Sequence, residues 1–186
     1  MVYFKHITIR KLYLKKAFIA VMVYVLTAPA LNAQKISEYQ VEAAFMFNFT
    51  KFVEWPASAF NNSTEPFVVG IVGNDPFGQY LREIIAGEKV MEHNIIIERY
   101  RDLSAVGKCH MLFVNLPGKT AEALNQLKDR SILTISDNDS FAENGGMIQF
   151  YPENETIRLR INVNAVKSAN LNVSSKLLRI AKLYQE

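Results

Sequence analysis

The chain has 186 residues, 49% of them hydrophobic and 21% charged, with a formal net charge of +3. It contains no low-complexity stretch, no repeat and no Pro/Ser-rich linker, which excludes a repeat protein and disfavours several domains. The length suits one domain with a single sizeable core.

The N-terminal segment has the pattern of a secretory signal peptide. Basic residues come first, at Lys5, Arg10, Lys11, Lys15 and Lys16. An apolar stretch from Ala17 to Ala28 follows, and Ala30 and Ala33 are small residues suited to cleavage before Gln34. The alternative, a retained anchor, needs about 20 apolar residues, and Pro29 interrupts the run. We therefore predict a signal peptide at residues 1–33 and a single domain at residues 34–186.

Removal of this segment changes the sign of the charge. It holds five of the 21 basic residues and none of the 18 acidic ones, so the remainder carries a formal charge of −2. Its charges are mixed and form no basic cluster, which excludes a nucleic-acid-binding protein.

The first elements after the signal peptide are a helix, a strand and a second helix. Ser37 with Gln40 forms a capping box for a helix over residues 38–54, which Trp55-Pro56 ends. The apolar run 67–72 is typical of a strand covered on both faces. Asp75 as N-cap and Pro76 at the first helical position then predict a helix to about Ala86.

The rest of the chain continues this alternation and then changes. We predict strands at 94–100, 109–115 and 132–136, a helix at 120–128, and an antiparallel hairpin of strands 147–151 and 156–163 joined by residues 152–155. Helices at 164–168 and 175–184, the second capped by Ser174, close the chain. This order predicts an α/β layered domain with a central mixed β-sheet flanked by helices, and a C-terminal β-hairpin followed by helices.

Two loops follow predicted strands and are candidates for ligand binding. They carry Asn74 and Asp75 after the first strand, and Ser136 and Asp137 after a later one. If the strands are parallel neighbours, both loops lie at the carboxyl edge of the sheet, where open α/β folds bind ligands. The alternative is structural: Asp75 caps a helix, and Asp137 accepts local backbone hydrogen bonds.

Signatures of an enzyme or a metal site are missing from the sequence. The histidines after residue 33 are His93 and His110, the sole cysteine is Cys109, and no nucleophile-elbow or zinc-protease motif occurs. Cys109 and His110 are adjacent on a predicted strand, so their side chains point to opposite faces. We predict no catalytic residues, no metal and no cofactor. Cys109 is either a buried free thiol or the site of an intermolecular bridge.

The first helix is apolar on two sides. One stripe contains Val41, Ala44, Phe45, Phe49, Phe52 and Val53, and the other contains Tyr39, Ala43, Met46 and Phe47. One side packs on the sheet. The second is buried by the same domain, by a second subunit or by a partner, and an exposed second stripe would be an interaction surface.

Five blocks of sequence resemble the YfiR family in order along nearly the whole chain after residue 33. They are Glu38 to Phe45 with Phe52 to Pro56, Gly73 to Gly78, Cys109 to Phe113, Leu133 to Asp137 with Phe141-Ala142 and Gly145 to Ile148, and Ile161-Asn162 to Leu177-Leu178. The resemblance implies a periplasmic regulator with helices around a mixed sheet, often a homodimer.

By this resemblance, the partner is the periplasmic domain of an inner-membrane diguanylate cyclase, held inactive so that cyclic di-GMP falls, and an outer-membrane lipoprotein sequesters the regulator. Tyr39, Ala43, Met46 and Phe47 are the partner-binding residues that we hypothesise. Family members with paired cysteines form disulfides, whereas this chain matches only at Cys109, which excludes an internal disulfide. The alternative function is a small-molecule-binding module that serves another membrane receptor, such as a histidine kinase.

Overall fold

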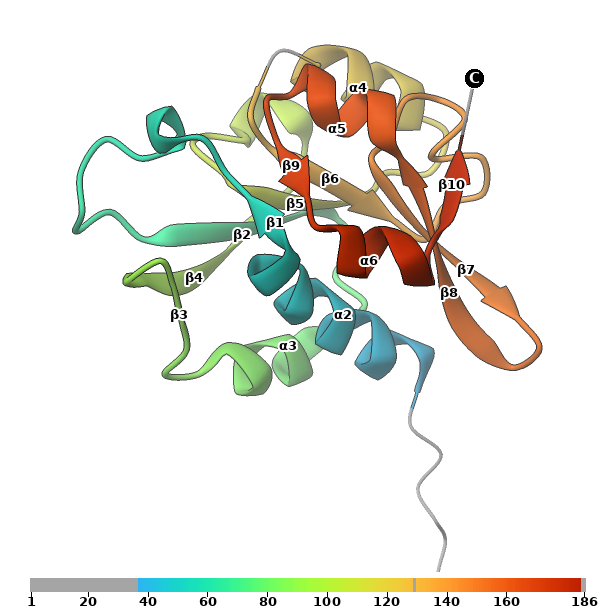
Figure 1. The fold of residues 1–186 in the computed structure, drawn as a ribbon, viewed down its shortest axis with the longest axis horizontal. Helices are drawn as coiled ribbons and strands as arrows, with labels where there is room; N and C mark the ends of the chain where they lie inside the picture. Colours follow the sequence, from blue (N-terminus) through green and yellow to red (C-terminus); the bar gives the residue numbers. More distant parts are fainter. Residues whose placement is uncertain (1–36, 129, 185–186) are drawn as a thin grey trace, which may run out of the picture. The chain divides into compact units, whose positions relative to one another are not determined.

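The computed structural model describes residues 37–128 and 130–184, which belong to the unit Ile36–Glu186 (Figure 1). The predicted signal peptide lies outside the described residues. The helices are α2 (Glu38–Phe52), α3 (Gly78–Ile85), α4 (Thr120–Leu127), α5 (Val163–Ser168) and α6 (Ser175–Ile180). The strands are β1 (Val53–Glu54), β2 (Phe67–Gly73), β3 (Lys89–Val90), β4 (His93–Tyr100), β5 (Met111–Asn115), β6 (Leu133–Ser136), β7 (Ile148–Glu153), β8 (Thr156–Asn162), β9 (Asn172–Val173) and β10 (Lys182–Tyr184).

Helix α2 begins as the sequence predicts. The Ser37 side chain accepts a hydrogen bond from the Gln40 backbone N–H, and the Gln40 side chain accepts one from the Ser37 N–H. This capping box satisfies two of the backbone donors that a helix start leaves without partners. The helix ends at Phe52, and the chain then becomes extended at β1, which pairs antiparallel with β9.

The main sheet has eight strands in the order β10-β8-β7-β6-β5-β2-β4-β3. Strands β4, β2, β5, β6 and β7 run parallel to their neighbours, whereas β8 is antiparallel to β7 and β3 is antiparallel to β4. Val69 lies opposite Met111, which sets the register between β2 and β5. The predicted mixed sheet is confirmed.

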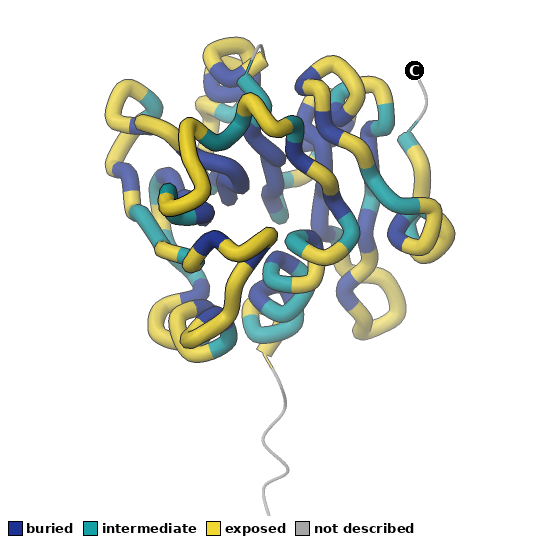
Figure 2. The backbone as a smooth tube through the Cα atoms, turned by 60° about the vertical axis from the view of Figure 1, so that its left-hand side comes forward, coloured by how far each residue is buried: buried dark blue, intermediate teal, exposed yellow. Residues whose placement is uncertain are grey.

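Different helices cover the two faces of the sheet because side chains alternate along each strand. In β2, Phe67, Val69 and Ile71 belong to a hydrophobic cluster that includes side chains of α2, α3, α5 and α6. Val68 and Val72 lie in a second cluster with side chains of α4. Figure 2 shows the buried strands in the middle of the molecule and exposed segments around them. The α/β layered fold is therefore confirmed.

The hairpin of β7 and β8 closes more tightly than predicted. Its turn is Asn154-Glu155, and both residues have positive φ, 51° and 58°. A two-residue turn of this kind matches the right-handed twist of the paired strands.

Three predicted helices differ from the structure, the first because α2 ends at Phe52 and residues 53–54 form β1 instead of helix. The helix after β2 begins at Gly78 rather than Pro76, although the Asp75 carboxylate does accept from the N–H groups of Phe77 and Gly78 at 2.8 and 3.1 Å. The predicted helix 175–184 is wrong in its second half: α6 ends at Ile180, and the chain then forms β10, which pairs parallel with β8. The free edge of β8 offers backbone hydrogen bonds that replace the last helical turn.

Candidate functional site

The carboxyl ends of β2, β5 and β6 lie at one edge of the sheet, but β2 and β6 are not the direct neighbours that the prediction assumed, because β5 lies between them. The backbone at the end of β2 contacts the backbone at the end of β5. A Cβ atom on Gly73, whose φ is +89°, would lie 1.9 Å from the Asn115 carbonyl oxygen, and the Asn74 N–H donates to the same oxygen at 3.3 Å. Main chain therefore fills the space between the ends of β2 and β5.

Two of the four predicted ligand residues have protein partners for their side chains. Asp75 accepts hydrogen bonds from the Phe77 and Gly78 N–H groups just before α3, and it forms an ion pair with Arg99 at 2.7 Å. Ser136 is fully buried, donates to the Val114 carbonyl at 2.7 Å and accepts from the Asn138 N–H at 3.1 Å. The backbone contacts of Asp75 are of the kind that its structural alternative predicts, and the contacts of Ser136 give that residue a structural role that the sequence analysis did not weigh. Ligand binding at Asn74, Asp75, Ser136 and Asp137 stays a prediction.

Asp137 follows β6, and its side chain is half-buried. Sequence reasoning placed Tyr39 in a partner surface and Asp137 in a ligand site, and it missed Glu42. Burial first, and then the negative charge of Asp137, raise the pKa values of Tyr39 and Glu42, so these three side chains are coupled electrostatically. We call this group the acidic cluster.

Glu42 is the unusual member of the acidic cluster. Its side chain is 3% exposed, and its Oε2 atom has no hydrogen-bond partner among the described residues. Burial, Asp137 and Glu38, in that order of effect, raise its pKa to about 8. Burial also raises the pKa of Asp137, and Asp139 adds to that increase. With a pKa of about 8, Glu42 keeps its proton at pH 7, because burial disfavours the charged carboxylate.

The sequence does contain a signal that Glu42 is buried, and that signal is the apolar row in which it stands. Residues 42, 46, 49 and 53 share one side of the helix, and Met46, Phe49 and Val53 are buried apolar residues. An acid in this row at helical spacing indicates a buried carboxyl, which sequence reasoning can detect.

The second apolar stripe of α2 is divided between the core and the surface. Ala43 and Met46 are fully buried, so for these two residues the alternative of burial by the same domain is the correct one. Tyr39 is 42% exposed, and its ring packs edge to face on the Phe77 ring, with the two ring centroids 6.3 Å apart. Phe47 is half-buried beneath the Lys51 ammonium, which lies 4.3 Å from the ring centroid.

His110 and Cys109 point to opposite faces of the sheet, as predicted. The His110 ring stacks on Phe60 and Phe67, and its Nδ1 accepts from the Val68 N–H at 2.9 Å, which leaves Nε2 to donate to the Ala59 carbonyl at 3.1 Å. Burial lowers the pKa of His110. Among the described residues, no three His, Cys, Asp or Glu side chains come together as metal ligands.

Cys109 is a buried free thiol in the second hydrophobic cluster. Burial raises its pKa to about 12, so the reactive thiolate is scarce at neutral pH. Of the two states that the sequence left open, the structure has the buried thiol.

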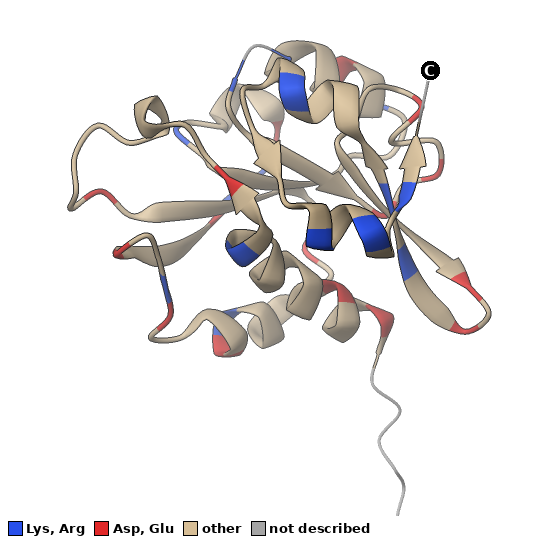
Figure 3. Ribbon diagram, in the orientation of Figure 1, with Lys and Arg blue, Asp and Glu red and all other residues tan. Residues whose placement is uncertain are grey.

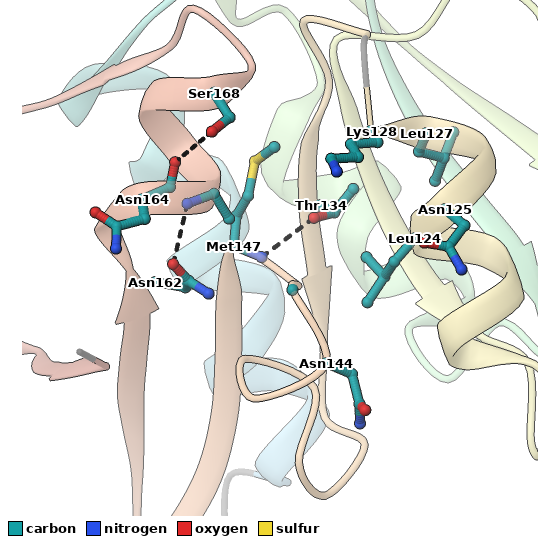
Figure 4. A pocket seen from close by; sticks show the side chains of 12 residues that line it. Leu124, Asn125, Leu127, Lys128, Thr134, Asn144, Met147, Asn162, Asn164 and Ser168 are labelled. Carbon is teal, nitrogen blue, oxygen red and sulfur yellow. Dashed lines mark hydrogen bonds between the residues drawn. The ribbon is translucent and has the colours of Figure 1, made fainter. Parts of the chain in front are cut away.

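A cavity of about 330 Å³ lies between α4 and α5 above the ends of β6 and β7 (Figure 4). Leu124, Leu127 and Met147 form apolar walls. Thr134 is at the base, where its hydroxyl accepts from the Met147 N–H at 3.2 Å, and Lys128 extends toward the middle of the lining residues. This volume is at the small end of the range for ligand pockets. No signal in the sequence pointed to this place.

The fold and these features define an α/β domain in which helix α2 presents the accessible aromatic residues Tyr39 and Phe47. The sequence model of the YfiR/HmsC-like family matches residues 39–182, and the chain belongs to that family. This is a periplasmic, regulatory family associated with control of diguanylate cyclase signalling, and not a family of enzymes. A comparison with individual curated proteins gives no match. No helix of the described residues is long and apolar enough to cross a membrane.

Proposed function

We infer that this protein binds the periplasmic sensor domain of an inner-membrane diguanylate cyclase and holds the enzyme inactive, which lowers cyclic di-GMP. The observation that carries the proposal is the family match over residues 39–182. The predicted export signal at residues 1–33 supports the same compartment. An outer-membrane lipoprotein as the sequestering partner and a homodimeric state are further parts of the proposal.

The exposed part of α2 is the surface that we propose for the receptor. Tyr39 and Phe47 are its accessible aromatic residues, and aromatic side chains dominate binding energy at many interfaces. Ala43 and Met46 contribute from beneath, because they fix α2 against the core. Their direct contact with a partner would need α2 to move.

The test is a pull-down with the tagged protein against solubilised membranes of its own source, with mass spectrometry of the retained proteins. A diguanylate cyclase with a periplasmic domain is the expected partner. Addition of the protein should then lower cyclase activity in reconstituted membranes. Failure to retain any membrane receptor across repeated conditions would contradict the proposal.

Variants of α2 locate the surface. Tyr39→Asp and Phe47→Asp should each weaken receptor binding at least about tenfold, since each places a charge in an apolar contact. Met91→Asp is the matched control, because Met91 is 62% exposed in the β3–β4 turn. Equal binding by folded Phe47→Asp and Met91→Asp would show that Phe47 is outside the surface.

The cavity between α4 and α5 favours a second candidate, a small-molecule-binding module that serves a receptor such as a histidine kinase. A ligand that binds only the folded protein raises its melting temperature. A screen of nucleotides and amino acids by thermal shift tests this candidate, with Ser168→Leu at the rim of the cavity as the variant that should abolish any shift.

A further inference from the structure

The described residues that line the cavity between α4 and α5 carry a positive charge and no negative charge. Twelve such residues line it, and none of them is an aspartate or a glutamate. Lys128 is the one charged residue of this set, and its side chain extends toward the middle of the lining (Figure 4). The five ion pairs of the described residues all involve other cations. This lining therefore attracts an anion, whereas an ammonium group would find no carboxylate in it.

The base of the cavity supplies a second hydrogen-bond donor. Thr134 is 2% exposed, and its hydroxyl accepts from the Met147 N–H at 3.2 Å. A hydroxyl can accept and donate at the same time, and no hydrogen bond among the described residues uses the Thr134 proton. Asn162, the other deeply buried polar residue of the lining, already accepts from the Ala165 N–H and donates to the Ala142 carbonyl, both at 3.0 Å. The Thr134 hydroxyl is thus able to donate to a ligand atom that enters the cavity.

The walls of the cavity are apolar, which restricts the kind of anion that fits. Leu124, Leu127 and Met147 are buried side chains of the lining, and a ligand chain that packs on them removes further apolar surface from water. One cation balances one negative charge, so a monoanion suits this lining better than a phosphate, which carries nearly two charges at neutral pH. A volume of about 330 Å³ accommodates a small molecule. These features together fit a carboxylate group on a short apolar chain.

We propose that the cavity between α4 and α5 binds a small monocarboxylate with an apolar chain. The inference rests on the second candidate function and deepens it, because it names the chemical class of the ligand. The Lys128 ammonium and the Thr134 hydroxyl donate hydrogen bonds to the carboxylate. The chain packs against Leu124, Leu127 and Met147. No residue of the described lining belongs to α2, so ligand binding and receptor binding can be measured separately.

The probe is hexanoate, titrated at constant pH and ionic strength into the isotopically labelled protein and followed in the NMR spectrum. The expected result is saturable chemical-shift changes at Thr134, Met147 and Ala165, with a Kd of about 1 mM or below. Hexanamide has nearly the same shape without the charge, and acetate has the charge without the chain. Each should bind at least about tenfold more weakly than hexanoate. Equal binding of either compound, or hexanoate shifts that do not saturate or that lie elsewhere, would overturn the proposal.

L-norleucine distinguishes a simple carboxylate from an amino acid. It has the carbon chain and the carboxylate of hexanoate and adds an ammonium group, for which the described lining offers no carboxylate. We expect it to bind at least about tenfold more weakly than hexanoate, because its ammonium group would lose water without gaining an ionic partner. Equal binding of L-norleucine would overturn the ligand class proposed and leave the second candidate function standing.

Variants test the two donors. Lys128→Met should weaken hexanoate binding about tenfold and leave hexanamide binding unchanged, a difference that a merely structural role for Lys128 would not produce. Lys176→Met is the matched control, because Lys176 is exposed on α6, where Figure 3 shows basic residues, and lies outside the lining. Thr134→Val should also weaken hexanoate binding, and the exposed Lys128 keeps the proposal testable if that variant does not fold. Equal hexanoate binding by Lys128→Met and Lys176→Met would overturn the proposal.

This titration uses no receptor, so its outcome is independent of the pull-down. A membrane cyclase retained by the protein, together with no hexanoate binding, would refute this inference and leave cyclase regulation standing. Specific hexanoate binding without any membrane receptor would support the site and contradict cyclase regulation.

Discussion

Replacement of Glu42 by glutamine is expected to stabilise the protein at neutral pH. In the folded state the carboxyl has a pKa of about 8, against its ordinary value of 4.5. The folded state therefore binds the proton more tightly than the unfolded state. The contribution of Glu42 to stability is fully present below pH 4.5 and is lost as the pH rises toward 8. At pH 7 the shift corresponds to a loss of about 3 kcal/mol, and relaxation of the structure and nearby water reduce this loss to about 1–2 kcal/mol.

The assay is urea unfolding followed by the fluorescence of Trp55, which is buried and should report on unfolding of the core. Between pH 5 and 8, the parent protein should lose stability relative to Glu42→Gln, and the two curves should diverge as the pH rises. Glu88→Gln, at an exposed position between α3 and β3, is the matched control and should follow the parent at every pH. Parallel curves for the parent and Glu42→Gln would refute the argument, because they would show that Glu42 is ionised in the folded protein.

Three further predictions concern the backbone, the thiol and the imidazole. Gly73→Ala should lower the free energy of unfolding by about 3 kcal/mol, because the new Cβ would collide with the Asn115 carbonyl and the residue has a positive φ. Gly78→Ala is the comparison: its φ is also positive, +56°, but the space around it is open, so the free energy of unfolding should fall by only about 1 kcal/mol. The Cys109 thiol should react with a thiol reagent only at the rate of unfolding, and fast reaction in the folded state would contradict its burial. Because the folded state lowers the pKa of His110, the free energy of unfolding should fall as the pH decreases below 6.5. NMR titration of the ring measures this pKa, and a value above 6.5 would contradict the expected sign.

The parts of the fold that the sequence predicts are those with local causes. The capping box of Ser37 starts α2, alternating residues such as Val68 and Val69 form a strand buried on both faces, and turn residues close the hairpin. Each pattern depends on neighbours within a few positions of the chain.

The parts that could not be predicted depend on distant segments. Residues 182–184 have an acceptable helical pattern, but they pair with Arg160 to Asn162 on the free edge of β8 and become a strand. Val53 likewise pairs with Val173, far away in sequence. Periodicity cannot show which edge is free, so tertiary pairing overrides the local preference.

The candidate site shows the same division. Sequence reasoning found Tyr39 and the loop after β2 separately, each from its own local pattern, but only the topology brings the Tyr39 ring against Phe77 in that loop. It also treated Ala43 and Met46 as possible surface residues, because a helix with two apolar sides does not reveal which side the domain covers.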